Sequence, residues 1–149
     1  MPAADDRPFS PRELHVWEGF LASHSRLTRH LSAALERECR LTVSEFEVLT
    51  ALEVVHPGGL RMTDLADRVQ LTPSGLSRLV ARLEHRGLVL RGPDETDQRA
   101  SCVSMTEEGT VLLRGASAGH RARVRECFLG RLGPQDRQAL AALWERLGP

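Results

Sequence analysis

The sequence predicts a mainly α-helical fold that carries one small β-hairpin. Three observations support this prediction: a long apolar stripe of helical period over residues 11–39, two short helical segments joined by a few residues near the middle of the chain, and two β-prone runs that follow them. With 149 residues, the chain is most simply a single domain, 1–149, that is long enough to bury a hydrophobic core.

Composition agrees with a globular protein. Hydrophobic residues make up 41% of the chain and charged residues 27%, which is the balance of a folded domain and not of a disordered one. No apolar run approaches the ~18–20 residues that a membrane span needs, and the start of the chain is polar, so we expect no membrane span and no signal peptide. The expected location is the cytoplasm. The formal net charge is zero, but residues 72–87 hold three arginines, one histidine and a single glutamate, which permits binding to a polyanion there.

The N-terminal stripe predicts a helix over residues 11–39 that packs against more than its own chain. Residues three and four positions apart share one face: Leu14, Trp17, Leu21, His24, Thr28, Leu31 and Leu35. Phe20, Leu27 and Ala34 lie beside this stripe, so the apolar surface is wider than a two-stranded seam requires. Such a surface needs more partners than a small domain usually supplies.

Two polar residues interrupt the stripe. His24 and Thr28 lie one turn apart, and Trp17 and Leu21 precede them as an apolar wall. These four residues are a candidate site for a small aromatic or anionic effector, whose carboxylate the two polar groups would bind. The favoured alternative is an ordinary, partly buried histidine that a backbone carbonyl or water satisfies.

Signals for helix starts and stops divide the middle of the chain. Ser44 and Glu47 fit a capping box, which predicts a helix that begins there and stops at the Pro-Gly-Gly breaker of residues 57–59. Thr63 is the predicted N-cap of a short helix. Thr72, which a proline follows, is the predicted N-cap of the next helix.

The helix that starts at Thr72 has two different faces. Its apolar residues fall on one side: Leu76, Leu79, Val80 and Leu83. The opposite side presents Ser74, Arg78, Ala81 and His85, with Ser77 and Arg82 on the flanks. Gly87 closes the helix. Two short helices joined by three or four residues have the proportions of a helix-turn-helix.

The segment after this helix is β-prone. Residues 88–91 and 100–105 flank a polar stretch that starts with Gly-Pro-Asp, so we expect a hairpin with a charged tip. At this tip, Asp97 is placed to hold Arg99 in an extended pose through a charge-assisted hydrogen bond. The alternative is an internal salt bridge from Arg99 to Asp94 or Asp97 with no role in binding.

Two more helices are predicted after the hairpin. Thr106 caps a long one that runs to about residue 130, and Gly133 followed by Pro134 opens a last one.

A basic helix within a helix-turn-helix, followed by a hairpin, indicates a winged helix-turn-helix that binds DNA. The major groove admits one α-helix, and residues near its start reach base edges or phosphates. The predicted DNA contacts are Thr72, Ser74, Ser77, Arg78 and Arg82 on the helix and Asp97 and Arg99 on the wing. Arg78 suits a guanine, Arg82 suits a backbone phosphate, and Arg99 suits the minor groove or its phosphates. Two alternatives stay open: a solvated surface helix, and a winged-helix adaptor that binds protein and not DNA.

Short motifs follow one another through this region. They are Leu-Thr-x-x-Glu-Phe-x-Val-Leu at 41–49, Arg-Met-Thr-Asp-Leu-Ala at 61–66, Leu-Thr-Pro-Ser-Gly-Leu-Ser-Arg-Leu-Val at 71–80, Arg-Leu-Glu-x-Arg-Gly-Leu-Val at 82–89, Asp-x-Arg at 97–99 and Thr-Glu-Glu-Gly at 106–109. Each motif is weak alone, and all of them in this order form a specific pattern. With them, the chain from about Trp17 to Gly109 resembles the MarR family of bacterial transcription regulators.

This resemblance implies an architecture and a function. The architecture is a homodimer in which helices at residues 11–39 and 107–148 interlock, with a winged helix-turn-helix at residues 42–105. The function is binding to a pseudo-palindromic operator in double-stranded DNA, usually as a repressor, with release often triggered by a small anionic or phenolic compound lodged between the dimerisation and DNA-binding regions. By position, the residues that match the family's recognition helix and wing pair are Ser74, Ser77, Arg78, Arg82, Asp97 and Arg99.

The chain departs from the family at its effector and oxidant sites, because it has no tyrosine and no cysteine in the first turns of the N-terminal helix. Its three cysteines, Cys39, Cys102 and Cys127, are far apart and most simply inert. Cys39 lies near Arg37 and Arg40, which suggests a lowered thiol pKa and an oxidant-sensing role as a minor alternative.

The sequence offers no chemistry for an enzyme, a metal site or a cofactor. It has no glycine-rich phosphate loop, no nucleophile elbow and no isolated acid pair, so we expect no catalytic residues. The six histidines form no HxxxH arrangement and the cysteines no Cys-x-x-Cys, so we expect no metal and no cofactor within one chain.

Overall fold

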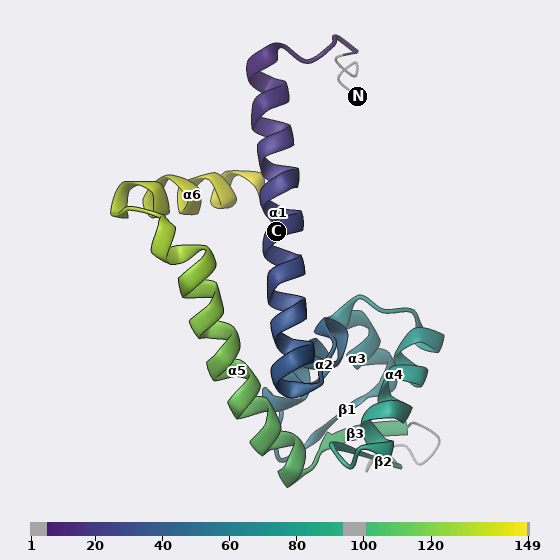
Figure 1. Ribbon diagram of the computed structural model, residues 1–149. Helices are drawn as coiled ribbons and strands as arrows, with labels where there is room; N and C mark the ends of the chain where they lie inside the picture. The colour runs from purple at the N-terminus through teal and green to yellow at the C-terminus, as the bar shows by residue number, and fades with distance from the viewer. Residues whose placement is uncertain (1–5, 94–100, 149) are drawn as a thin grey trace.

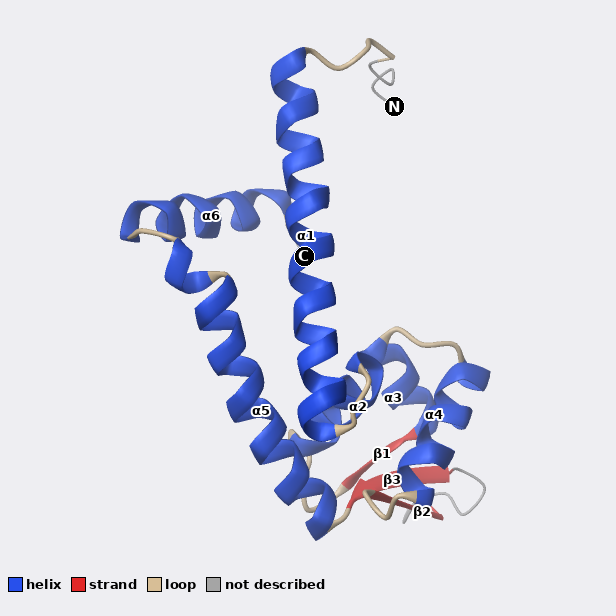
Figure 2. Ribbon diagram, viewed as in Figure 1, coloured by secondary structure: helices blue, strands red, loops and turns tan. Residues whose placement is uncertain are grey.

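The computed structural model describes residues 6–93 and 101–148 of the chain (Figure 1). In chain order its elements are α1 (Pro11–Cys39), α2 (Val43–Glu53), β1 (Gly59–Arg61), α3 (Met62–Val69), α4 (Pro73–His85), β2 (Val89–Pro93), β3 (Ser101–Met105), α5 (Glu107–Cys127), the short 3-10 helix η1 (Leu129–Arg131) and α6 (Pro134–Leu147). The fold is mainly helical with one small sheet, as the sequence predicts (Figure 2).

The elements form a compact part and a tall part. Helices α2, α3 and α4 gather around the small sheet, and α1 rises from them as a long upright rod (Figure 1). Helix α5 leaves the sheet at the foot of the molecule, and α6 crosses back toward α1 near the far end of α5 (Figure 1). The rings of Phe20 on α1 and Trp144 on α6 meet edge to face, with their centroids 6.5 Å apart.

The sheet has three antiparallel strands in the order β1-β3-β2. The β2–β3 pair is the predicted hairpin, with Arg91 opposite Val103. Strand β1 was not predicted from the sequence. Three residues are too few to reveal a two-residue period, and the pairing of Leu60 with Val103 is set by the fold and not by local pattern. Gly59 permits it, because a Cβ there would lie 2.6 Å from the Cys102 sulfur.

The hydrophobic core lies in the compact part. It is built from apolar residues of α2, α3, α4, β2, β3 and the start of α5, among them Leu49, Leu65, Leu76, Val89 and Leu113, each 0% exposed. The long α1 contributes only its lower end, where Ala34 and Leu35 are buried, and α6 has no buried residue among those described. The upper half of α1 therefore has no core of its own.

Most helix ends agree with the sequence, and three differ. The caps at Thr72 and Thr106 and the bounds of α1 are confirmed. Helix α2 starts from a capping box of Thr42 and Glu45, and not of Ser44 and Glu47; both pairs fit the same motif, and the earlier one places the cap directly after the buried Leu41.

The second difference is at α3, which begins at Met62 without a side-chain cap, so Thr63 is not its N-cap. The preceding residue, Arg61, already ends strand β1 and therefore takes the N-cap position. Helix α5 also ends at Cys127, slightly earlier than predicted, and η1 follows it. Within the described residues, none of the helices is long and apolar enough to span a membrane.

Candidate nucleic-acid interface

The turn between α3 and α4 fixes the start of the candidate DNA-reading helix. Gln70 adopts a left-handed conformation with φ 53°, which ends α3, and the Leu71 amide donates to the Ala66 carbonyl oxygen at 3.1 Å. The Thr72 hydroxyl then accepts a hydrogen bond from the Gly75 amide at 3.2 Å. Pro73 occupies the first helical position, where no amide hydrogen is needed.

Helix α4 buries one face and exposes the other. Its apolar residues, Leu76, Leu79, Val80 and Leu83, are at most 4% exposed. The predicted DNA contacts on this helix lie on the other side: Thr72, Ser74, Arg78 and Arg82 are exposed and Ser77 is partly exposed. The structure therefore brings these five residues together on one surface, as their spacing predicts.

The wing residues of the prediction cannot be placed. Asp97 and Arg99 lie outside the described residues, as does Asp94, so both the predicted DNA contact and the alternative salt bridge remain predictions.

Arg91 joins the wing to α4 and was missed by the sequence analysis. Its Nη2 donates to the Ser77 carbonyl oxygen at 2.7 Å, and its Nε lies 3.5 Å from Glu84 Oε2. The Arg91 amide also donates to Glu84 Oε1 at 3.3 Å. These contacts fasten β2 along α4, so the base of the wing and the helix form one unit. In the sequence, Arg91 is only the last residue of a β-prone run.

Arg82 contacts the body of the protein as well as solvent. Its Nε donates to Oε1 of Glu45 on α2 at 3.4 Å, and Arg86 Nη1 lies 3.6 Å from Glu45 Oε2. The side chain of Arg82 is still 57% exposed. Arg78 differs, because within the described residues it forms no ion pair, and its guanidinium is exposed to solvent.

The C-terminal end of α4 is tied to the start of α5. The Thr106 hydroxyl donates to the Gly87 carbonyl oxygen at 2.7 Å and accepts from the Gly109 amide at 3.0 Å. The Thr106 amide donates to the Leu88 carbonyl oxygen at 3.1 Å. Gly109 packs so closely that a Cβ would collide with that same carbonyl oxygen.

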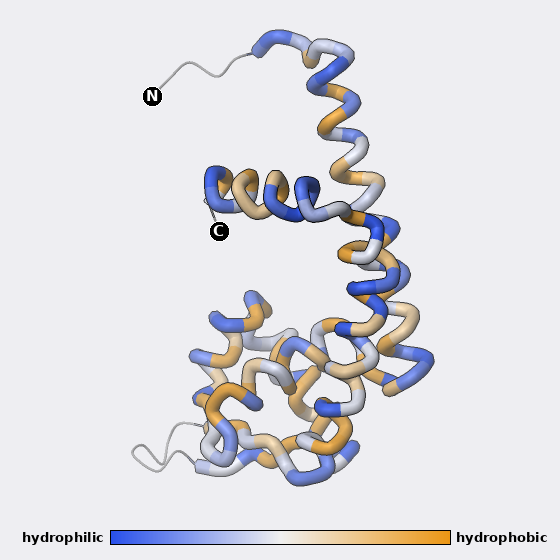
Figure 3. Tube along the Cα trace, turned by 90° about the vertical axis from the view of Figure 1, so that its left-hand side faces the viewer, coloured by the Kyte–Doolittle hydropathy of each residue, from blue (hydrophilic) through white to orange (hydrophobic). Residues whose placement is uncertain are grey.

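The tall part carries an apolar groove between α1 and α6. The groove has a volume of about 620 Å³ and is lined by Arg12, Glu13, Val16, Trp17, Phe20, Leu143, Trp144 and Leu147. Several of these large side chains are half exposed, including Trp17 at 49% and Trp144 at 47%. Figure 3 shows α6 and the upper half of α1 standing clear of the compact part, with hydrophobic residues along both.

Of the four candidate effector residues, only Trp17 lines this groove. Leu21, His24 and Thr28 lie farther down α1, and all four are exposed. Phe20 connects the groove to the histidine, because its ring stacks on Trp17 at 6.0 Å and on His24 at 6.1 Å.

Comparison with known proteins places this geometry in a family. A family model described as MarR family matches residues 41–100. The crystal structure of Sco3205, a MarR family transcriptional regulator from Streptomyces coelicolor in complex with DNA, is 31% identical, covers 97% of this chain and 90% of its own, and superposes with a TM-score of 0.85. The chain belongs to the MarR family.

Two curated relatives of this MarR-family chain have names that describe regulators. The transcriptional regulator HosA of Escherichia coli O157:H7 is 31% identical over 72% of the chain and 77% of its own length. The HTH-type transcriptional repressor MdtR of Bacillus subtilis is 29% identical over 55% of the chain and 52% of its own length. The predictions of a winged-helix transcriptional regulator, and of a protein that is not an enzyme, are therefore confirmed by the family.

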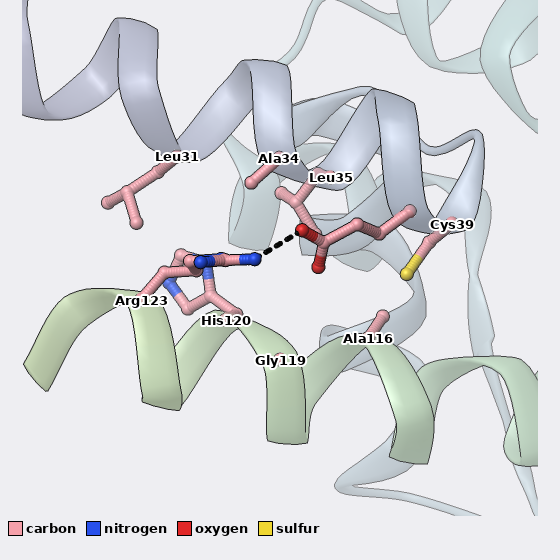
Figure 4. Close-up of a pocket in the computed structure, with 9 residues that line it drawn as sticks. Leu31, Ala34, Leu35, Cys39, Ala116, Gly119, His120 and Arg123 are labelled. Atoms are coloured by element: carbon pink, nitrogen blue, oxygen red, sulfur yellow. Dashed lines mark hydrogen bonds and ion pairs between the residues drawn. The ribbon is translucent and has the colours of Figure 1, made fainter. Parts of the chain in front are cut away.

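A second, smaller cavity of this MarR-family chain lies between α1 and α5 (Figure 4). Its volume of about 10 Å³ is room for roughly one water molecule. Arg123 of α5 donates to Glu38 of α1 at 2.7 Å across it. Hydrogen bonds from Arg123 and, to a smaller extent, Arg37 lower the pKa of the Glu38 carboxyl. Hydrogen bonds to Glu38 and Glu126 raise the pKa of Arg123. The ion pair therefore joins the lower half of α1 to α5.

Cys39 borders the same cavity, and its environment is opposite to the one that the minor alternative of an oxidant-sensing thiol requires. Burial, with a smaller effect from the neighbouring Glu38 carboxylate, raises the pKa of the Cys39 thiol. The arginines beside it in sequence do not lower this pKa, because Arg37 is paired with Glu38. A raised pKa keeps the thiol protonated and argues against an oxidant sensor. Among the described residues, no group of three or more His, Cys, Asp or Glu is arranged to hold a metal ion.

Proposed function

We propose that this chain is a homodimeric repressor that binds a pseudo-palindromic operator in double-stranded DNA. The observation that carries the proposal is the two-faced α4, whose apolar side is sealed in the core while its polar, arginine-bearing side is exposed. A helix anchored through one face only leaves the other face free to enter a major groove. The relative Sco3205, solved in complex with DNA, supports this assignment.

The proposed DNA contacts divide by position. Ser74, Ser77 and Arg78 lie toward the start of α4, where side chains reach base edges, and Thr72 caps that start. The exposed guanidinium of Arg78 suits the two acceptors of a guanine, and Arg82, one turn later, suits a phosphate. Asp97 and Arg99 complete the proposal as the wing contact.

The proposed dimer uses the tall part of the molecule. Helices within residues 11–39 and 107–148 would form the interface, and residues 42–105 the DNA-binding region. The exposed apolar groove between α1 and α6 supports a second copy as its occupant, because large exposed apolar patches mark interaction sites. A twofold pair presents two α4 helices to successive major grooves, ~34–36 Å apart.

Repression then follows from occupancy, because a dimer seated on a promoter blocks it. The printed name of the relative MdtR, a transcriptional repressor, supports this direction of control. We propose release by a small aromatic or anionic effector that binds near Trp17, Leu21, His24 and Thr28 and favours a different helix separation. The setting of this activity is the cytoplasm, where the operator lies.

The proposal is tested first at Arg78. Arg78→Ala should cost about 1–3 kcal/mol of binding to a duplex that the wild-type protein selects from a random-sequence pool, and should relax the preferred sequence. Fluorescence anisotropy gives the affinity, and repeated selection with the variant gives the preference. Arg68→Ala, an exposed arginine at the end of α3, is the control for the loss of one positive charge: it should leave the preferred sequence unchanged and lower the affinity less than Arg78→Ala does.

Two results would contradict this reading. If the wild-type protein selects no sequence from the pool, the winged-helix adaptor that binds protein becomes the better description. If Arg78→Ala binds the selected duplex as tightly as the wild type, α4 does not read bases through this arginine.

A further inference from the structure

One carboxylate in the compact part is buried. Among the described residues, Glu45 is the only charged residue that is buried, at 5% exposed, whereas the other acidic residues reach solvent. A buried charge is costly unless it is paired and hydrogen-bonded. This carboxylate lies in the first turn of α2, and its hydrogen-bond and ion-pair partners indicate its role.

Both oxygens of Glu45 are engaged, and from two different helices. Oε2 accepts from the Thr42 amide at 2.9 Å, which completes the capping box of α2. Oε1 accepts from Arg82 Nε at 3.4 Å, and Arg86 Nη1 lies 3.6 Å from Oε2. The two arginines belong to the C-terminal half of α4 and its cap, 37 residues or more along the chain. Glu45 thus joins the start of α2 to the DNA-facing helix.

Arg82 faces two ways. Its Nε points inward to Glu45, while the side chain as a whole is 57% exposed. Within the described residues, no other acidic group pairs with Arg82, and the Nε contact leaves its two terminal nitrogens available to a further acceptor. A guanidinium has donors on separate edges and can bind a carboxylate through one edge and a phosphate through another. The carboxylate holds the long side chain in one pose and so reduces the rotamer entropy lost when it binds.

We propose that Glu45 is a positioning residue for DNA binding: it orients Arg82 toward a backbone phosphate and fixes the C-terminal half of α4 against α2. This inference rests on the proposed function, since it assumes that α4 contacts DNA. The competing role is helix capping alone, in which Glu45 starts α2 and has no effect on DNA binding.

A charge-neutral substitution separates the two roles. Glu45→Gln keeps the size of the side chain and the acceptor that the capping box needs, since glutamine serves at this position too. It removes only the negative charge that holds Arg82 and Arg86. The matched control is Glu47→Gln, because Glu47 is an exposed carboxylate on the same helix and forms no ion pair among the described residues.

The direction of the effect is diagnostic. Removing a negative charge from a DNA-binding protein normally strengthens its attraction to phosphates, which predicts equal or tighter binding for both variants. Positioning predicts the opposite for Glu45→Gln alone, a loss of roughly tenfold in affinity for the selected duplex, the scale of one charge-assisted hydrogen bond. Binding as tight as that of Glu47→Gln would overturn the proposal.

A double-mutant cycle with Arg82→Ala tests whether the effect passes through Arg82. If Glu45 orients Arg82, the arginine substitution costs much less affinity in the Glu45→Gln background than in the wild type. The slope of affinity against salt concentration falls by one phosphate contact in each single variant and falls no further in the double variant. Equal costs in both backgrounds would refute the proposed route.

A second variant covers the case in which Glu45→Gln does not fold. Arg82→Lys keeps the charge on an exposed side chain but offers one ammonium, which cannot serve carboxylate and phosphate through separate edges. It should bind the selected duplex more weakly than the wild type, although more tightly than Arg82→Ala because the charge remains, and wild-type affinity for Arg82→Lys would count against positioning. Arg78→Ala, measured alongside, shows whether α4 contacts DNA at all, so failure of the proposed function is recognised separately.

Discussion

At the scale of single residues, the contacts around Thr106 decide how α4 and α5 meet. Its hydroxyl is both a donor to Gly87 and an acceptor from Gly109, and its amide donates to Leu88. Gly109 is buried against the Leu88 carbonyl oxygen, where no side chain fits. One threonine and one glycine therefore bring two backbone segments into direct contact.

Gly109→Ala should destabilise the protein by about 2–3 kcal/mol, the cost of overpacking a tight contact, because the Leu88 backbone must move to admit the methyl group. Urea unfolding followed by circular dichroism measures the free energy of unfolding. Gly115→Ala is the control on the same helix: a Cβ there meets open space, and alanine is the better helix former, so stability should stay level or rise. Equal stability of the two variants would mean that the Leu88 contact is looser than described.

Residues also differ in how far their roles follow from sequence. The outward face of α4 was predictable, because its exposure depends only on helical period and on the cap at Thr72. The roles of Glu45 and Arg91 were not, because their contacts join residues 37 and 14 positions apart. No local pattern marks such a pair, and a lone acid or arginine in a sequence is normally a solvated side chain.

At the scale of elements, the long helices and their caps were predictable and the third strand was not. Helices α1 and α6 follow from apolar spacing and from proline at their first turns. Strand β1 has only three residues and pairs across the fold with β3. The two possible capping boxes at the start of α2 show a further limit, because both fit the same motif and only the folded structure shows which one forms.

Arg91 fastens β2, at the base of the wing, to α4. Arg91→Ala should cost about 1–2 kcal/mol of stability, since it removes a charge-assisted hydrogen bond to the Ser77 carbonyl oxygen. Amide hydrogen exchange should accelerate in β2 and leave α3 unchanged, because only the attachment of the wing is lost. Arg114→Ala, at an exposed position on α5, is the control. Unchanged exchange in β2 would show that strand pairing alone holds the wing base.

At the scale of the whole molecule, the compact and tall parts have different sources of stability. The compact part encloses the hydrophobic core, whereas the upper half of α1 and all of α6 keep their apolar residues at the surface. This division is what the wide N-terminal stripe predicts, since its apolar surface is wider than its own chain covers.

Val16→Asp should weaken the proposed dimer. Val16 lines the α1–α6 groove and is 67% exposed, and a carboxylate there would be desolvated in the interface, raising the dimer dissociation constant roughly 10- to 100-fold. Analytical ultracentrifugation measures this constant. Tryptophan emission on dilution gives an independent value, because both tryptophans of the chain line the groove. Val54→Asp, at the 74% exposed C-cap of α2, is matched in chemistry and should leave assembly unchanged; equal effects would exclude the groove as the interface.

The direct attachment of α5 to the end of α4 has a mechanical consequence. Helix α5 has 21 residues and is therefore a rigid lever about 30 Å long. A tilt of about 5° at its far end displaces its foot by roughly 3 Å, which is the length of a hydrogen bond. Thr106 and Gly109 hold the start of α5 tightly against the end of α4. A small change in the tilt of α5 would therefore move the end of α4 by a distance that is large compared with a hydrogen bond.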